Sequence, residues 1–207
     1  MTKERKNLHD KQFYTNMVMC PDLEQYHKNR AKESLRQLNL LENKFLCHLG
    51  CGDGTMTQEL SKTTNRILAL EINTDEYNKA LEKKYDCPIE IHRSDAFEYL
   101  EKQSSINPDV FYLWVNYSAM EDWIEKIIEL RGHTHPTIIL GIGMHKFCAP
   151  VDNNGDPVQL LKAKELKEKY QGQIKLTSFP LGNISLGRQQ NNGLFGYLIL
   201  NVQKETI

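Results

Sequence analysis

Three glycines at alternate positions, Gly50, Gly52 and Gly54, follow a short apolar run in LCHLGCGDG, residues 46–54. Glycine tolerates positive φ and lacks the Cβ that would keep a ligand away from the backbone. The stretch therefore fits either a ligand-binding loop or a tight turn without a ligand. A dinucleotide-binding fingerprint is G-x-G-x-x-G, with the pyrophosphate over the start of the next helix. Here the third glycine comes one residue earlier, which argues against a nicotinamide or flavin dinucleotide.

Two carboxylates follow at the ends of the next two predicted strands. Glu71 ends the run RILALE, at a place where a carboxylate can accept hydrogen bonds from both hydroxyls of a ribose. Asp95 and Ala96 follow the third predicted strand. Each acid also has a structural alternative, a solvated strand end for Glu71 and the N-cap of the next helix for Asp95. The glycine loop and the two acids, taken in this order, indicate a ligand site more strongly than any one of them.

The elements that must position these residues alternate between short apolar runs and segments of helical period. Strands are predicted at 44–49, 66–71, 89–92, 109–115, 136–142, 173–179 and 194–202. Helices are predicted at 21–39, 55–63, 74–84, 95–103, 119–131 and 158–170. This order predicts an α/β fold with a doubly wound, mostly parallel, seven-stranded sheet and helices on both faces. Because no helix separates the last two strands, the last strand is expected to run antiparallel.

Length and composition fit one globular domain. The chain has 207 residues, no internal repeat and no linker-like stretch, so we expect a single domain over 1–207, with an N-terminal helical segment at 1–43 and a sheet core at 44–207. The net charge of −1 gives no overall attraction for nucleic acid. No apolar stretch reaches the ~20 residues that span a bilayer, and the start lacks the apolar part of a signal peptide. We therefore expect a cytoplasmic protein with no membrane partner.

No metal or disulfide site is predicted. The five cysteines are odd in number, scattered and without a C-x-x-C pair. His133 and His135 form an H-x-H pair, but they precede the fifth predicted strand and so belong to the end of the sheet opposite the glycine loop. Without further ligands in place, this pair is a poor metal signal.

The stretch FLCHLGCGDGTMTQEL, residues 45–60, resembles the first motif of the class I S-adenosylmethionine-dependent methyltransferases, in which a strand runs into G-x-G-x-G and then a helix. The resemblance covers about residues 40–145 by motif, and the terminal hairpin agrees with it. It implies a Rossmann-like fold, S-adenosylmethionine as the cofactor and a methyl-transfer reaction. The residues that it implies around the cofactor are Gly50, Cys51, Gly52 and Gly54 in the loop, Glu71 on the ribose, and Asp95 with Ala96 near the adenine.

His48 departs from this family pattern. Many members carry Asp or Glu two residues before the first glycine, where a carboxylate helps to hold the cationic amino group of the methionine part. A neutral imidazole can accept one hydrogen bond there, but an imidazolium repels the ammonium. If His48 contacts the cofactor, binding should weaken below the pKa of His48. The alternative is a buried strand histidine that bonds to a neighbouring group.

The segment after the fourth strand, WVNYSAMEDW, is the second departure, because it lacks the [DN]PP[FYW] motif of enzymes that methylate nucleobase amino groups. Asn116 and Tyr117 still offer an amide and an aromatic ring to an acceptor. Residues 12–15, QFYT, are similar to a segment of some adenine-N6 methyltransferases. Nucleobase N-methylation is therefore a less favoured alternative, and net charge does not support a nucleic-acid partner. A methyltransferase-like binding or scaffold protein without catalysis is the main alternative to an enzyme.

Methyl transfer from a sulfonium is an in-line displacement, so the protein mainly positions the nucleophile and removes its proton when needed. The catalytic candidates after the fourth and fifth predicted strands are Asn116, Tyr117 and His145. His145 is either a general base or an ordinary loop histidine. The sequence identifies neither the methyl acceptor nor the oligomeric state.

Overall fold

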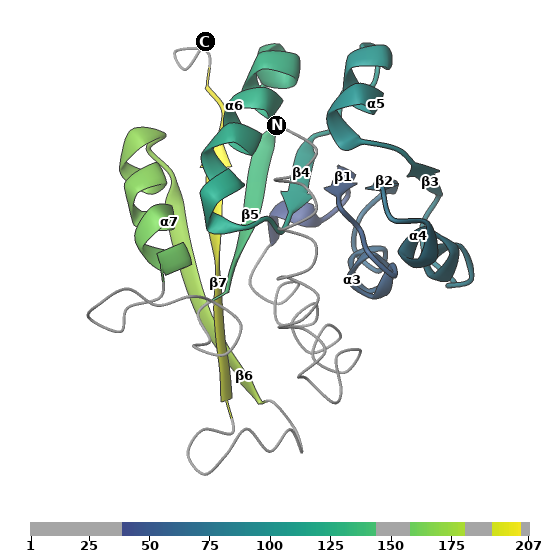
Figure 1. Cartoon of the computed structure of the whole chain (residues 1–207), viewed down its shortest axis with the longest axis horizontal. Coiled ribbons are helices and arrows are strands. Elements are labelled where there is room, and N and C mark those ends of the chain that lie inside the picture. Colours follow the sequence, from purple (N-terminus) through teal and green to yellow (C-terminus); the bar gives the residue numbers. More distant parts are fainter. Residues whose placement is uncertain (1–38, 144–157, 181–191, 204–207) are drawn as a thin grey trace.

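One mixed sheet of seven strands organises the protein, in the order β3-β2-β1-β4-β5-β7-β6 (Figure 1). The computed structural model describes residues 39–143, 158–180 and 192–203. The strands are β1 (Phe45–Leu49), β2 (Arg66–Glu71), β3 (Ile89–Arg93), β4 (Val110–Leu113), β5 (Thr137–Gly143), β6 (Gln173–Pro180) and β7 (Asn192–Asn201). Strands β1 to β5 pair in parallel, and β7 is antiparallel to β5 and to β6. The predicted mostly parallel sheet with an antiparallel last strand is confirmed.

Helices and short 3-10 turns connect these strands. The α-helices are α3 (Thr55–Leu60), α4 (Thr74–Leu81), α5 (Ala96–Lys102), α6 (Met120–Arg131) and α7 (Val158–Lys169). The 3-10 turns are η1 (Asn39–Leu41), η2 (Tyr117–Ala119) and η3 (Gly132–Thr134). These α-helices lie where the sequence predicts them, although α3 and α4 each end three residues early. Residues 1–38, which include all but the last residue of the predicted helix at 21–39, lie outside the described residues.

The sheet separates two apolar layers, because successive side chains of a strand point to opposite faces. One layer joins the strands to α5, α6 and α7. The other includes Leu41 of η1 and residues of α3. Within β1, Leu46 belongs to the α3 layer, whereas Cys47 and Leu49 belong to the other layer. A stripe of Met120, Ile124 and Ile127 buries one side of α6, as its helical spacing predicts.

The strand order reverses at β1 and β4, which are neighbours in the sheet. The chain proceeds from β1 outward to β2 and β3, and then returns to the other side of β1 with β4 and β5. In open α/β sheets, ligands bind beyond the carboxyl ends of the strands at this reversal. Leu49 and Leu113 are register partners at the ends of β1 and β4. Gly50 and Trp114 therefore leave the sheet side by side at the expected ligand-binding edge.

Side chains of α7 hold it against the segment that follows β4. Gln159, which is buried, donates a hydrogen bond to the Val115 carbonyl at 2.9 Å. The Lys162 and Lys169 ammonium groups lie 2.6 and 2.7 Å from the two carboxylate oxygens of Glu121. These contacts fix the start of α6 and the strand exit ahead of it. Within the described ranges, no helix is long and apolar enough to cross a membrane.

Candidate cofactor site

The glycine loop folds back over the end of β2. Gly50, Gly52 and Gly54 have φ values of 70°, 56° and 77°, a left-handed region that favours glycine. The backbone N–H groups of Gly50 and Cys51 both donate to the Leu70 carbonyl, at 2.8 and 3.1 Å. The N–H of Gly54 donates to the Cys51 carbonyl at 3.2 Å. The loop is therefore a fixed turn anchored to the neighbouring strand.

The three glycines differ in what surrounds them. A Cβ built on Gly50 or Gly52 would meet no atom within 4 Å, so these two positions border open space. A Cβ on Gly54 would lie 2.5 Å from the Tyr85 hydroxyl oxygen and 3.0 Å from Ala80 Cα. Gly54 therefore allows the loop to pack against α4. Gly50 and Gly52 provide a surface on which a ligand can approach the backbone.

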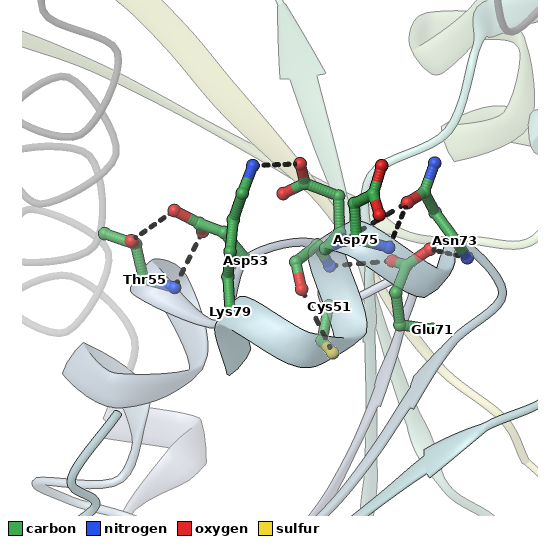
Figure 2. A network of polar contacts seen from close by, with 9 residues as sticks. Cys51, Asp53, Thr55, Glu71, Asn73, Asp75 and Lys79 are labelled. Atoms are coloured by element: carbon green, nitrogen blue, oxygen red, sulfur yellow. Dashed lines mark hydrogen bonds and ion pairs between the residues drawn. The ribbon is translucent and has the colours of Figure 1, made fainter. Parts of the chain in front are cut away.

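The Glu71 carboxylate lies against this loop, as Figure 2 shows. Its Oε2 accepts a hydrogen bond from the Gly52 N–H at 2.8 Å, and its Oε1 accepts one from the Asn73 N–H at 2.8 Å. The residue is only 8% exposed. Each carboxylate oxygen has a second lone pair, so two bonds to the backbone leave capacity for a ligand hydroxyl. The structure thus brings together the glycine loop and the strand-end acid that the sequence singled out.

Two carboxylates, those of Asp53 and Glu71, lie at the glycine loop. Both Asp53 oxygens accept hydrogen bonds from Thr55 at the start of α3, from its N–H at 2.9 Å and from its hydroxyl at 2.8 Å (Figure 2). On α4, a hydrogen bond to Glu76 raises the pKa of Lys79, and the Asp53 charge adds to this shift. A pyrophosphate at the start of α3 would meet the Asp53 carboxylate. The backbone N–H groups of Gly50, Cys51, Gly52 and Gly54 already donate hydrogen bonds within the protein, so they are not available to a pyrophosphate. The geometry therefore disfavours a dinucleotide.

Cys51 contributes to the site through its backbone. Its side chain is buried, and the thiol lies 3.7 Å from the Gly52 carbonyl oxygen. Burial, reinforced by the Glu71 and Asp53 charges, raises the pKa of the Cys51 thiol to about 12. The thiol therefore stays protonated at neutral pH and is not a nucleophile.

His48 lies under the loop in the α3 layer. It is 3% exposed, and its Nδ1 lies 2.8 Å from the Thr57 hydroxyl of α3. The imidazole packs edge-on against the Tyr112 ring, with the ring centres 5.1 Å apart. His48 is thus a buried strand histidine bonded to a neighbouring side chain. A contact with the amino group of a cofactor stays a prediction.

Asp95 and Ala96 lie at the start of α5, beyond the end of β3. Asp95 Oδ1 accepts hydrogen bonds from the Phe97 and Glu98 N–H groups at 3.0 and 3.2 Å, so Asp95 is the N-cap of this helix. The Ser94 N–H donates to the Glu71 carbonyl at 3.0 Å, which ties the exit of β3 to the end of β2. Asp95 therefore belongs to the same edge as Glu71, and its role at an adenine stays a prediction.

Two of the acceptor candidates, Asn116 and Tyr117, lie side by side at η2. Asn116 caps η2, where its Oδ1 accepts a hydrogen bond from the Ser118 N–H at 3.3 Å. Tyr117 packs against the layer that contains α5, α6 and α7. His145 and residues 12–15 lie outside the described residues. Among the described residues, no group of three or more His, Cys, Asp and Glu side chains is placed to hold a metal ion.

Two apolar side chains at the site were not singled out from the sequence. Ile72 follows Glu71 and is 50% exposed, so an apolar group stands beside the carboxylate. Trp114 directly follows Leu113, the register partner of Leu49, and is partly exposed, with its ring packed on Gly141 of β5. Ile72 directly follows the predicted strand at 66–71, and Trp114 is the last residue but one of the predicted strand at 109–115. Their location at the ligand-binding edge of the sheet could be recognised only from the strand register.

No protein-family model and no curated protein matches the sequence. Several solved structures match the fold. An O-methyltransferase from Bacillus cereus in complex with SAH has a TM-score of 0.58 at 11% identity, over 83% of this chain and 80% of that chain. A precorrin-8w decarboxylase from Methanobacterium thermoautotrophicum has a TM-score of 0.57 at 15% identity, over 83% and 90%. For a precorrin-6y C5,15-methyltransferase from Geobacter metallireducens, the TM-score is 0.54 at 17% identity, over 83% and 87%. The chain has the fold of the class I S-adenosylmethionine-dependent methyltransferases.

Proposed function

We propose that this protein is an S-adenosylmethionine-dependent methyltransferase. The observation that carries the proposal is the Glu71 carboxylate, held 2.8 Å from the Gly52 N–H beside two glycines that border open space. This pair lies at the reversal of strand order, where α/β sheets bind ligands. Because fold alone does not determine function, the proposal rests on these residues and not on the structural neighbours.

The residues present fit the cofactor. Gly50 and Gly52 would lie under the methionine part, since a Cβ at either position would fill the adjoining open space. Glu71 would accept hydrogen bonds from the ribose hydroxyls through its remaining lone pairs. Ile72 and Asp95, at the exits of β2 and β3, would border the adenine. The carboxylates of Asp53 and Glu71 suit a ligand that carries a positive charge.

When bound, S-adenosylmethionine would supply an electrophilic methyl group on a sulfonium. The protein then has to hold the acceptor atom in line with that methyl group and to receive its proton where the acceptor has one to lose. Asn116 and Tyr117 follow β4, the strand beside the glycine loop, and His145 follows β5. We keep these three residues as the candidates for the acceptor side.

A binding protein without catalysis is the second candidate function. It is favoured by His48, which is buried against Thr57 and Tyr112 and offers no carboxylate to the cofactor. It is also favoured by Asn116, whose side-chain oxygen caps η2. Such a protein would still bind the sulfur nucleosides, but it would transfer no methyl group.

Thermal unfolding with three ligands tests the proposal. A ligand that binds the native state raises its stability by mass action, so S-adenosylmethionine and S-adenosylhomocysteine should raise the melting temperature and NAD should not. Gly52→Val should abolish both shifts, because a branched side chain would fill the open space and strain a backbone with φ of 56°. Stabilisation by NAD alone, or by none of the three at millimolar concentration, would refute the proposal. Release of S-adenosylhomocysteine in the presence of an acceptor would then separate an enzyme from a binding protein.

A further inference from the structure

A buried hydroxyl group lacks a partner in the layer that contains α3. Tyr112 of β4 is fully buried, and among the described residues its hydroxyl oxygen has no hydrogen-bond partner. His92 Nε2 is in the same state, but a carboxylate oxygen of Glu90 lies 3.7 Å from it. An unpaired buried polar group costs free energy, so almost all such groups in native proteins have a partner. The Tyr112 hydroxyl therefore indicates a partner from outside the chain.

Contacts with β1 place the Tyr112 ring beside the turn that holds the glycine loop. Tyr112 and His48 are register partners on β4 and β1, and their ring centres are 5.1 Å apart. His48 is the last residue but one of β1, and its Nδ1 lies 2.8 Å from the hydroxyl oxygen of Thr57, the third residue of α3. The imidazole thus lies between the strand that enters the loop and the helix that leaves it. Tyr112 packs against this imidazole and belongs to the same buried cluster as Cys51 of the loop.

Open space at the loop begins two residues beyond His48. A Cβ built on Gly50 or Gly52 would meet no atom within 4 Å. The proposed function puts the amino-acid part of the cofactor over these two glycines. That part ends in an ammonium and a carboxylate, and each of these charged groups needs a partner when it leaves water.

The two charged groups of the ligand find different partners at the loop. The carboxylates of Asp53 and Glu71 suit the ammonium. The ligand carboxylate needs a hydrogen-bond donor instead. The backbone N–H groups of the loop that face this need, those of Gly50, Cys51, Gly52 and Gly54, already donate within the protein. The phenol O–H of Tyr112 is a donor without an acceptor, beside a ligand group that would need one.

We propose that the Tyr112 hydroxyl donates a hydrogen bond to the carboxylate of the cofactor's amino-acid part and so selects ligands that carry this group. The inference rests on the proposed function and deepens it. A hydrogen bond to a carboxylate is charge-assisted and stronger than one between neutral groups. His48, packed edge-on against the phenol, fixes the orientation of the Tyr112 ring.

Calorimetry with two ligands that differ by one carboxylate tests this role without knowledge of the acceptor. The probes are S-adenosylhomocysteine and its decarboxylated analogue S-adenosyl-3-thiopropylamine, which keeps the ammonium. Tyr112→Phe removes only the hydroxyl. It should weaken the binding of S-adenosylhomocysteine by about 10- to 100-fold, because a hydrogen bond to a charged group is lost, and change the affinity for the analogue less than about twofold.

The stability of the unliganded protein is a second measurement. Because the Tyr112 hydroxyl has no partner among the described residues, Tyr112→Phe should leave the melting temperature of the free protein unchanged or raise it. The matched control is Tyr170→Phe, since the Tyr170 hydroxyl donates to Glu125 of α6 at 3.3 Å, on the other side of the sheet. This control loses the same atom and should change neither affinity.

Equal weakening of both ligands by Tyr112→Phe, or unchanged affinity for both, would overturn the inference and leave the proposed function intact. A lower melting temperature of the free variant would do the same, because it would show that the hydroxyl already has a partner within the protein. Failure of the wild type to bind either ligand would overturn the proposed function as well.

Discussion

At the scale of single residues, the positions of the loop G-C-G-D-G have different roles. Gly50 and Gly52 leave space for a ligand, whereas Gly54 packs against Ala80 and Tyr85 of the α4 region. Cys51 is a buried, protonated thiol that contributes its backbone. One sequence motif therefore combines binding and packing roles, and substitutions can separate them.

Alanine at Gly54 should destabilise the fold more than alanine at Gly52. Both positions have positive φ, which costs about 1 kcal/mol for a residue with a Cβ. At Gly54 the Cβ would also clash with the Tyr85 hydroxyl and with the Ala80 backbone, which adds about 1–3 kcal/mol. Urea denaturation should show this difference in the free energy of unfolding. Tyr85→Phe should recover part of the loss in Gly54→Ala, and equal destabilisation by the two alanines would contradict these separate roles.

At the scale of elements, α7 is joined to α6 by a cluster of ion pairs. Lys162 and Lys169 both donate to Glu121, and Lys169 also reaches Glu125 at 2.9 Å. The hydrogen bonds from Lys162 and Lys169 lower the pKa of Glu121 to about 2. With Gln159 on the Val115 carbonyl, the cluster holds the exit of β4, on which Trp114 and Asn116 depend for their positions.

This cluster predicts a pH dependence of stability. The pKa of Glu121 is depressed in the folded state, so its contribution is present above the unfolded value of about 4.5 and is lost as the pH falls toward 2. Because the Glu121 side chain is 30% exposed, we expect no more than about 1 kcal/mol, and less in high salt. Urea unfolding should show that Glu121→Gln lowers stability at pH 7 and has little effect near pH 2. The same loss at both pH values would contradict the ion-pair account, and Glu168→Gln, on the exposed side of α7, is the control.

At the scale of the whole molecule, local patterns predicted the elements and their class, because buried strands and amphipathic helices have distinct periods. The predicted strand at 109–115 ends at Leu113 instead, where the pairing of β4 with β1 and with β5 stops. The order of the strands within the sheet was harder to predict from the sequence. That β7 inserts between β5 and β6 depends on pairing between distant segments, which no local pattern encodes.

The local features of the candidate site could be predicted from the sequence for the same reason. The glycine spacing and the acid at the end of β2 can be identified within short stretches of sequence. Other contacts join residues that are far apart in the chain. They are the hydrogen bond between Gly52 and Glu71, the packing of Gly54 on Ala80, and the contact of Trp114 with Gly141. The first two of these contacts decide which glycine can face a ligand, so the structure was needed to assign the roles of the glycines.

The central claim is that Glu71 and the glycine loop form a site for S-adenosylmethionine, and titration calorimetry with S-adenosylhomocysteine tests it most directly. The wild type should bind with micromolar or tighter affinity, and Glu71→Ala should weaken binding at least about tenfold, because a buried acceptor of hydrogen bonds is lost. Asp75→Asn, which removes a nearby exposed charge, is the matched control and should bind like the wild type. Unchanged affinity in a folded Glu71→Ala variant, or no binding by the wild type, would contradict the account.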